Sequence, residues 1–247
     1  MHRPVVVDCL QGGAHVICEK PLADTPPNAF AITEAAEASG KLLMTAFCHR
    51  FHPPVARLKQ LIDEGALGMI GMFRNRFAGP FKGIEDVWFS KLEVSGGGCL
   101  MDTSVHSVDL FRFLIGEVKR AQGAVTLLNE NLAPGVEDTA AMLLQSKSGA
   151  IGVLEASWTL QGGVNVVEVY GTEGVAEIHY WDGFPSRYKT VAMEGWEPLP
   201  EEGDRFVGEL THFARAVRGE APLAVTGHDG LRAVEVIYEA YASAGLQ

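Results

Sequence analysis

The chain has 247 residues, of which 47% are hydrophobic, and its 31 acidic and 20 basic residues give a formal net charge of −11. This apolar content is enough for a buried core in one large or two modest domains, and it excludes a largely disordered chain. The acidic balance, without any run rich in lysine or arginine, argues against nucleic acid or an anionic membrane as a partner. Asp8 interrupts the first apolar stretch, so neither a signal peptide nor a spanning helix is predicted.

Four cysteines are scattered along the chain without a CxxC pair: Cys9, Cys18, Cys48 and Cys99. This distribution predicts neither a disulfide framework nor a thiolate metal site, and it fits a reducing, cytoplasmic compartment. His49 and His52 form an HxxH pair, but this spacing suits one helix face less well than i, i+4, and no metal site is predicted there. The kinds of functional site that the composition leaves open are a small-molecule site and a protein interface.

The first 51 residues are predicted to alternate helices and strands. An apolar helical stretch at 4–10 precedes a β-branched strand at 15–18, and a second helix at 26–40 precedes a second buried strand at 41–47. This alternation is typical of a parallel α/β sheet. Because such a sheet does not normally begin on a helix, we expect the chain to enter it partway through.

Residues 52–247 follow a different pattern. The predicted order is a helix at 53–64, a strand at 69–77, a helix at 99–114, successive strands over 118–191 with turns at 147–149 and 171–174, and two closing amphipathic helices. Successive strands without intervening helices imply an antiparallel sheet, and the closing helices are expected to cover one of its faces. The predicted fold class is α/β plus α+β: the C-terminal remnant of a parallel sheet, then a mostly antiparallel sheet with helices on one face.

The tripeptide Glu19-Lys20-Pro21 stands at the end of the first predicted strand, where α/β sheets place their ligands. Partial burial lowers the pKa of a lysine, and an ammonium at such a position can hold a substrate hydroxyl and stabilise developing alkoxide charge. On position alone, a surface lysine in an ordinary X-Pro turn is the commoner structure.

A second candidate lies at 96–109, where three glycines precede a helix that carries Asp102, His106 and Asp109 at i, i+4 and i+7. This spacing puts the three side chains on one helix face, which is expected to line a cleft, while the glycines would let the backbone approach a ligand. A histidine beside carboxylates is a plausible general base. On spacing alone, a solvated helix face behind a flexible linker is the alternative.

Together, the runs GGAHVICEKPLA at 12–23 and GGGCLMDTSVHSVDL at 96–110 resemble the glucose-fructose oxidoreductase/inositol dehydrogenase (Gfo/Idh/MocA) family, and the similarity extends over essentially the whole chain. The resemblance implies an NAD- or NADP-dependent oxidoreductase that acts on a sugar, inositol or similar polyol. It also implies an incomplete Rossmann domain at 1–51, an α+β substrate and oligomerisation domain at 52–247, and a homodimer or homotetramer formed through the antiparallel sheet.

Site residues follow from the same resemblance. It implies that Lys20, with Glu19 and Pro21 beside it, contacts the nicotinamide and the substrate, and that Asp102 and His106 bind the substrate hydroxyl and move its proton. Ser104 departs from the glycine that is usual in the family between this Asp and His, and it is expected to narrow the pocket.

The GxGxxG turn through which the family binds the dinucleotide is absent from the sequence. About 60 to 75 residues, or two βα units, are expected ahead of Met1, which we interpret as an internal or miscalled start. The choice between NAD and NADP stays open, because the residue that reads the ribose 2′ position would lie in that part. The alternative hypothesis is a truncated, non-catalytic ligand-binding or oligomerisation module.

Overall fold

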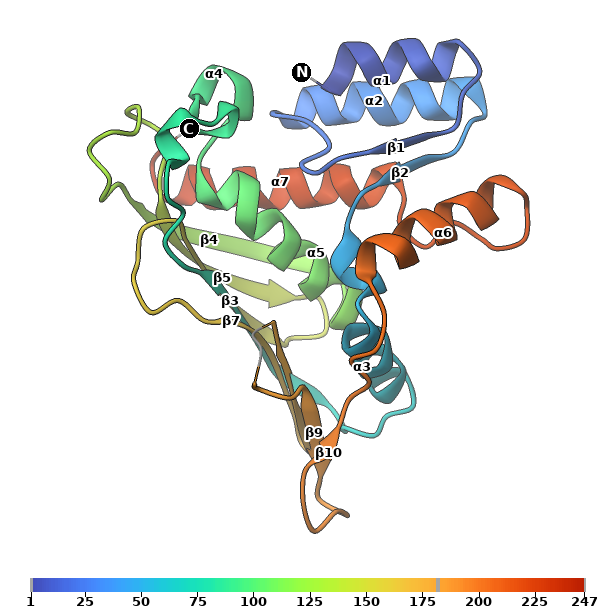
Figure 1. Ribbon diagram of the computed structural model, residues 1–247, viewed down its shortest axis with the longest axis vertical. Coiled ribbons are helices and arrows are strands. Elements are labelled where there is room, and N and C mark those ends of the chain that lie inside the picture. Colours follow the sequence, from blue (N-terminus) through green and yellow to red (C-terminus); the bar gives the residue numbers. More distant parts are fainter. Residues whose placement is uncertain (1, 181–182, 247) are drawn as a thin grey trace.

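The computed structural model describes residues 2–180 and 183–246 (Figure 1). Trp181 and Asp182, which fall within the stretch predicted as successive strands, lie outside the described residues. The helices are α1 (His2–Gln11), α2 (Pro26–Ser39), α3 (Pro53–Asp63), α4 (Leu92–Ser95), α5 (Val105–Leu114), α6 (Arg205–Val217) and α7 (Gly227–Ser243). The strands are β1 (Val16–Cys18), β2 (Leu43–Thr45), β3 (Ile70–Ala78), β4 (Val118–Thr126), β5 (Thr139–Ser146), β6 (Ile151–Ser157), β7 (Asn165–Gly171), β8 (Gly174–His179), β9 (Arg187–Thr190) and β10 (Glu197–Pro198).

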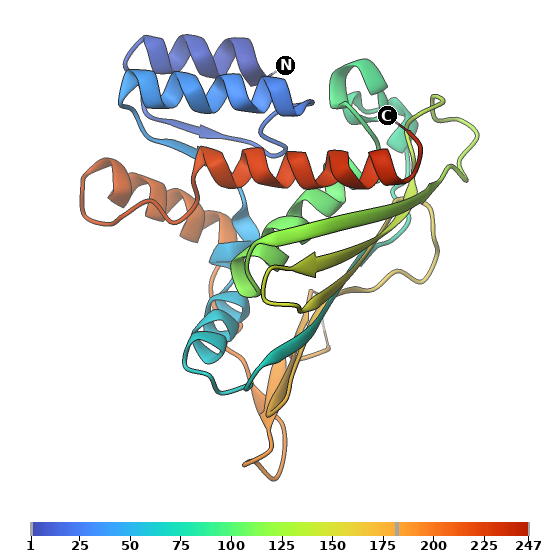
Figure 2. The same ribbon diagram turned by 180° about the vertical axis from the view of Figure 1, so that it is seen from behind.

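The N-terminal part of the chain forms a small sheet in which β1 and β2 run parallel. Helices α1 and α2 lie side by side against this sheet in both views (Figures 1 and 2), and they share a core with it through Leu10, Ile32 and Leu43. Helix α2 begins where the Thr25 hydroxyl accepts a hydrogen bond from a backbone N–H, and it ends at Gly40, whose φ of 62° favours glycine. The predicted alternation of helices and strands is confirmed.

The second sheet has eight strands in the order β10-β9-β8-β7-β3-β6-β5-β4, and all its neighbours are antiparallel except β3 and β6. Along β5 the side chains alternate: Met142 and Leu144 are buried, whereas Ala141 and Leu143 are exposed. Helices α5 and α7 pack on the buried face, and the helices lie to one side of this sheet in both views (Figures 1 and 2). The predicted fold class is confirmed.

The two closing helices differ in what they cover. Helix α7 packs along β4, as predicted, but the prediction that α6 also covers a sheet is wrong. Because α5 and α7 occupy the inner face, α6 packs against the 3-10 turn Cys48–Phe51 and leaves Phe206 and Leu210 of its apolar stripe 50% and 57% exposed. Within the described ranges, no helix combines the length and the apolar character that crossing a membrane requires.

The glycines before α5 allow close packing of the chain. A Cβ atom on Gly98 would lie 1.9 Å from the carbonyl oxygen of Glu137, and one on Gly97 would lie 2.1 Å from Tyr241 Oη. The Glu137 carboxylate accepts hydrogen bonds from the backbone N–H groups of Gly98 and Leu100 and from the Tyr241 hydroxyl, at 2.7 to 2.9 Å. The prediction that these glycines admit a ligand is therefore corrected: protein atoms fill the space.

Candidate active site

Lys20, which follows β1, contacts Asp102, which lies in the helical turn Leu100–Ser104 before α5. After a cis peptide bond between Lys20 and Pro21, the Lys20 ammonium donates hydrogen bonds to Asp102 Oδ1 at 2.8 Å and to the Asp102 carbonyl oxygen at 2.9 Å. The Thr103 hydroxyl donates to Asp102 Oδ2 and accepts from Trp158 Nε1. Both charged side chains are largely buried, so the pair has a fixed geometry and one remaining ammonium donor.

His106 lies close to this pair, one helical turn after Asp102. Its ring packs edge-on against the ring of His49, with centroids 4.6 Å apart, and its Nδ1 atom is buried without a hydrogen-bond partner among the described residues. Burial lowers the pKa of His106 well below its usual value, and the neighbouring His49, Lys20 and Arg205 lower it further. The imidazole is therefore neutral at pH 7 and can accept a proton.

The three predicted residues, Lys20, Asp102 and His106, come together in one cleft of about 340 Å³. Its lining consists of Lys20, His49, Phe77, Asp102, Thr103, His106, Asn165, Tyr180 and Arg205. The sequence signals of the two motifs, 82 residues apart, thus converge on one place.

Sequence reasoning missed five polar residues of the cleft: His49, Thr103, Asn165, Tyr180 and Arg205. His49, whose Nδ1 lies 2.9 Å from the Tyr180 hydroxyl, belongs to the HxxH pair at 49–52, so that pair was a usable signal. Tyr180 directly follows β8, and Arg205 is the first residue of α6. Nothing in the local sequence of either residue marks it as part of a site. Arg205 lies over the Tyr180 ring at 5.8 Å, which places a guanidinium at the cleft.

Asp109 does not line the cleft, so the prediction that it shares an open polar face with Asp102 and His106 is wrong. It is 1% exposed and accepts hydrogen bonds from the guanidinium of Arg50, which also pairs with Asp229. Helix α5 is buried on most of its surface, and it begins after a π-helical turn, Leu100–Ser104, that changes the side-chain spacing of an ideal helix. The buried guanidinium compensates the charge of Asp109.

The remaining predicted positions lie around the cleft. The Glu19 side chain is exposed and does not line it, whereas Pro21 lines an adjoining, mostly apolar recess of about 250 Å³ together with Asp102 and Trp88. Ser104 is 1% exposed and lines neither space, so the expectation that it narrows the pocket is wrong. The cofactor-binding role of Glu19, Lys20 and Pro21 stays a prediction.

Two family models match the chain. Residues 1–47 match the oxidoreductase family with an NAD-binding Rossmann fold, and residues 55–177 match the GFO/IDH/MocA C-terminal domain. Fold and cleft together thus define an oxidoreductase with a Rossmann-type sheet and a second, mostly antiparallel sheet. The chain belongs to the Gfo/Idh/MocA family, as the two motifs predicted.

Similar proteins include polyol and sugar dehydrogenases. The myo-inositol 2-dehydrogenase of Thermotoga maritima is 29% identical over 254 residues, which cover 97% of this chain and 73% of the relative. The levoglucosan dehydrogenase of Pseudarthrobacter phenanthrenivorans is 29% identical over 73% of this chain and 53% of its own length. The crystal structure of aldose-aldose oxidoreductase from Caulobacter crescentus, complexed with glycerol, matches with a TM-score of 0.89 and 27% identity over 99% of this chain and 74% of that chain. This chain thus spans only part of the length of these proteins.

Proposed function

We propose that this chain carries the substrate and proton-transfer site of an NAD(P)-dependent dehydrogenase that oxidises a hydroxyl group of a sugar, an inositol or a similar polyol. The observation that carries the proposal is the meeting of the Lys20–Asp102 pair with a neutral His106 in one cleft. When an alcohol is oxidised by hydride transfer to a bound cofactor, the protein must supply a proton acceptor and a group that stabilises the developing charge on oxygen, and these residues are suited to both tasks.

Each of the three residues has a distinct role in this proposal. The free donor of Lys20 holds the substrate oxygen and stabilises its developing negative charge, while Asp102 fixes the position of the ammonium. His106 accepts the hydroxyl proton, because its lowered pKa keeps a nitrogen lone pair available at neutral pH.

The nicotinamide cofactor would lie next to Lys20, Asp102 and His106. The apolar recess beside Pro21, Trp88 and Asp102 fits a flat nicotinamide ring, and the bound cofactor supplies the hydride acceptor. Either NAD or NADP fits this proposal, because the residues that would read the ribose are not among those of the recess.

A polyol fits the remaining lining. Thr103, Asn165 and Tyr180 supply hydroxyl and amide groups for several substrate hydroxyls, and Phe77 supplies an apolar surface for a ring. The inositol and sugar dehydrogenases among the similar proteins support the same substrate class.

Cofactor titration and a substrate panel together test the proposal. The chain is titrated with NADH and NADPH while ligand fluorescence is followed, and NAD(P)H formation is assayed with inositols and aldoses. Saturable micromolar binding and turnover of at least one polyol are expected. Neither binding nor turnover, in a folded protein, would instead support the non-catalytic ligand-binding or oligomerisation module.

The proposal includes self-association and location. The outer face of the large sheet exposes Leu143 and Ile151, which are 49% and 41% accessible. Glu155 on this face forms ion pairs with both Arg74 and Arg76. This face can therefore pack against a second copy in a homodimer or homotetramer. The four free cysteines support a reducing, cytoplasmic compartment.

A further inference from the structure

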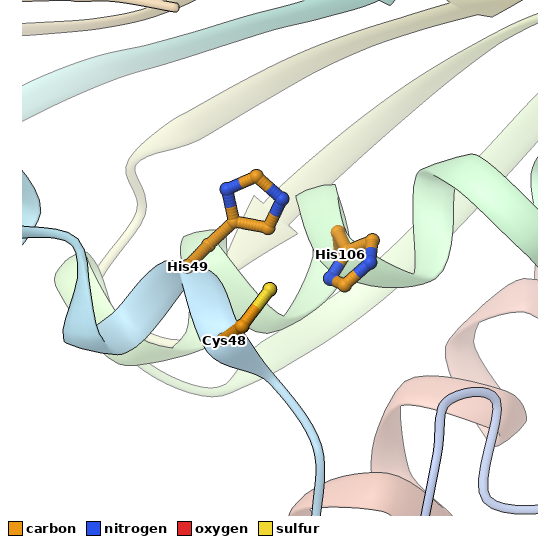
Figure 3. A group of neighbouring side chains, drawn as sticks. All are labelled: Cys48, His49 and His106. Carbon is orange, nitrogen blue, oxygen red and sulfur yellow. The ribbon is translucent and has the colours of Figure 1, made fainter. Parts of the chain in front are cut away.

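Cys48, His49 and His106 form a cluster (Figure 3). His49 and His106 line the cleft, and Cys48 is buried beside them. Cys48 and His49 come from the 3-10 turn that follows β2, and His106 comes from the first turn of α5. The Cys48 sulfur and one ring nitrogen of each histidine all lie within 4.8 Å of one another. One thiolate and two imidazoles are ligands that Zn²⁺ prefers.

The hydrogen bonding of the two histidines independently indicates a ligand. His106 Nδ1 is buried and has no partner among the described residues, although buried polar atoms are normally hydrogen-bonded. His49 Nδ1 is engaged by the Tyr180 hydroxyl at 2.9 Å, which orients the ring and leaves Nε2 as its available nitrogen. An outer partner of this kind is typical of histidines that bind metals.

We propose that Cys48, His49 and His106 bind one zinc ion, with the fourth coordination position open to the cleft. His52, the other half of the HxxH pair in the sequence, is not among the residues whose ligand atoms gather here, and its ring stacks on Tyr180 with the centroids 4.9 Å apart. Three protein ligands and an open position are the arrangement of zinc sites that exchange ligands.

Local charge makes the thiolate essential for binding. Lys20 and Arg205 line the same cleft and disfavour a cation, and Asp102 is already paired with Lys20. A metal-bound Cys48 contributes a negative charge at the ion itself, which offsets this repulsion. The loss of this one ligand should therefore weaken binding more than the loss of a neutral ligand would.

Zinc at this site would switch off the proposed dehydrogenase, a consequence that rests on the proposed function. A neutral imidazole has one nitrogen lone pair, since its other nitrogen carries a hydrogen. Whichever nitrogen of His106 binds the metal, that lone pair is used and the ring cannot accept the substrate proton. Zinc and proton acceptance are thus mutually exclusive at His106.

Cobalt binding tests the site without any assay of turnover. The chelator-treated chain is titrated with Co²⁺, and we expect one equivalent to give intense visible bands of a tetrahedral ion and a near-ultraviolet thiolate-to-cobalt band, both removed by Zn²⁺. Cys48→Ser should lose the thiolate band and bind at least tenfold more weakly. Cys9→Ser, at an exposed position of α1, should behave like the parent chain.

No binding, binding without the thiolate band, or undiminished binding by Cys48→Ser would overturn the site. Should that variant fail to fold, zinc-edge X-ray absorption of the unaltered chain decides: one sulfur and two imidazoles support the site, and oxygen or nitrogen alone contradicts it. In a polyol dehydrogenase assay, Zn²⁺ should inhibit reversibly, with at least tenfold lower sensitivity in Cys48→Ser. Bound zinc with undiminished turnover would overturn the switch while leaving the site intact.

Discussion

The ammonium of Lys20 donates two hydrogen bonds to Asp102, one to the carboxylate and one to the backbone carbonyl oxygen. The contact to the backbone ties the lysine to the π-helical turn Leu100–Ser104 that leads into α5, in addition to a side chain that could rotate. These two contacts fix the position of the ammonium and leave its third donor for a ligand in the cleft, which His106 also lines. This geometry makes Lys20 and His106 the residues whose loss should affect turnover most.

We expect Lys20→Ala and His106→Gln each to lower kcat by about 10²- to 10⁴-fold, the usual range for a lost proton acceptor or a lost charge contact at a reacting oxygen. Steady-state kinetics on the best polyol of the panel measures this change. His228→Gln is the control, because this exposed histidine of α7 pairs with Glu37 at the surface, away from the cleft. Undiminished kcat in both site variants would exclude these roles, and circular dichroism checks that they fold.

The elements that sequence could predict are those whose signals are local. Helix α2 has its proline start and glycine stop in its own local sequence, and the predicted turns at 147–149 and 171–174 lie where β5 gives way to β6 and β7 to β8. Lys20, Asp102 and His106 could be predicted because each belongs to a motif that marks it. Their meeting in one cleft followed from the resemblance and not from the spacing.

What sequence could not predict depends on distant partners. Asp109 resembles a cleft residue by its spacing, but Arg50, 59 residues earlier, makes it a buried ion pair. Arg205 and Tyr180 reach the cleft from the far end of the chain, where no local pattern identifies them. A π-helical turn such as Leu100–Ser104 likewise has no simple sequence signature.

The buried pair of Arg50 and Asp109 should be a large contributor to folding stability. Asp109→Ala leaves the guanidinium, 8% exposed, with Asp229 as its remaining carboxylate, and we expect the free energy of unfolding to fall by about 3 to 5 kcal/mol. Urea denaturation followed by fluorescence measures it. The exposed pair of Arg57 and Glu64 provides the comparison: Glu64→Ala should change stability by less than about 1 kcal/mol. Equal effects of the two substitutions would contradict this assignment.

Glu137 should hold the π-helical turn Leu100–Ser104 before α5, and hence the position of Asp102. In Glu137→Gln, one oxygen that accepts a backbone N–H is replaced by an NH₂ donor, so we expect a loss of about 2 to 3 kcal/mol in unfolding free energy. Tyr241→Phe removes only the hydroxyl contact and should cost about 1 kcal/mol. Chemical denaturation of both variants checks this order, and the reverse order would show that the hydroxyl contact dominates.

Self-association through the large sheet predicts that Leu143→Asp shifts the protein toward monomer, because a buried, unpaired carboxylate in an interface is strongly unfavourable. Sedimentation velocity at several protein concentrations measures the shift. Val5→Asp, at a position on α1 that is 64% exposed, is the matched control and should leave the assembly unchanged. A Leu143→Asp protein that assembles like the parent would place the interface elsewhere.

Glu209 gives a pH-dependent prediction. Its side chain is buried, its Oε1 atom has no partner among the described residues, and burial, followed by the charge of Glu19, raises its pKa to about 7. A carboxyl whose pKa is raised in the folded state binds its proton more tightly there than in the unfolded chain, where the pKa is about 4.5. Below pH 4.5 both states are protonated and the group has no effect; between pH 4.5 and 7 it increasingly destabilises the fold, and the penalty is complete above pH 7.

Glu209→Gln removes this penalty, so its unfolding free energy relative to the parent should rise by about 1 to 3 kcal/mol between pH 5 and pH 8. Urea denaturation at both pH values measures the difference, and Glu239→Gln on the exposed side of α7 should show no such rise. A Glu209→Gln difference that is the same at pH 5 and pH 8 would mean that the buried carboxyl does not titrate in this window.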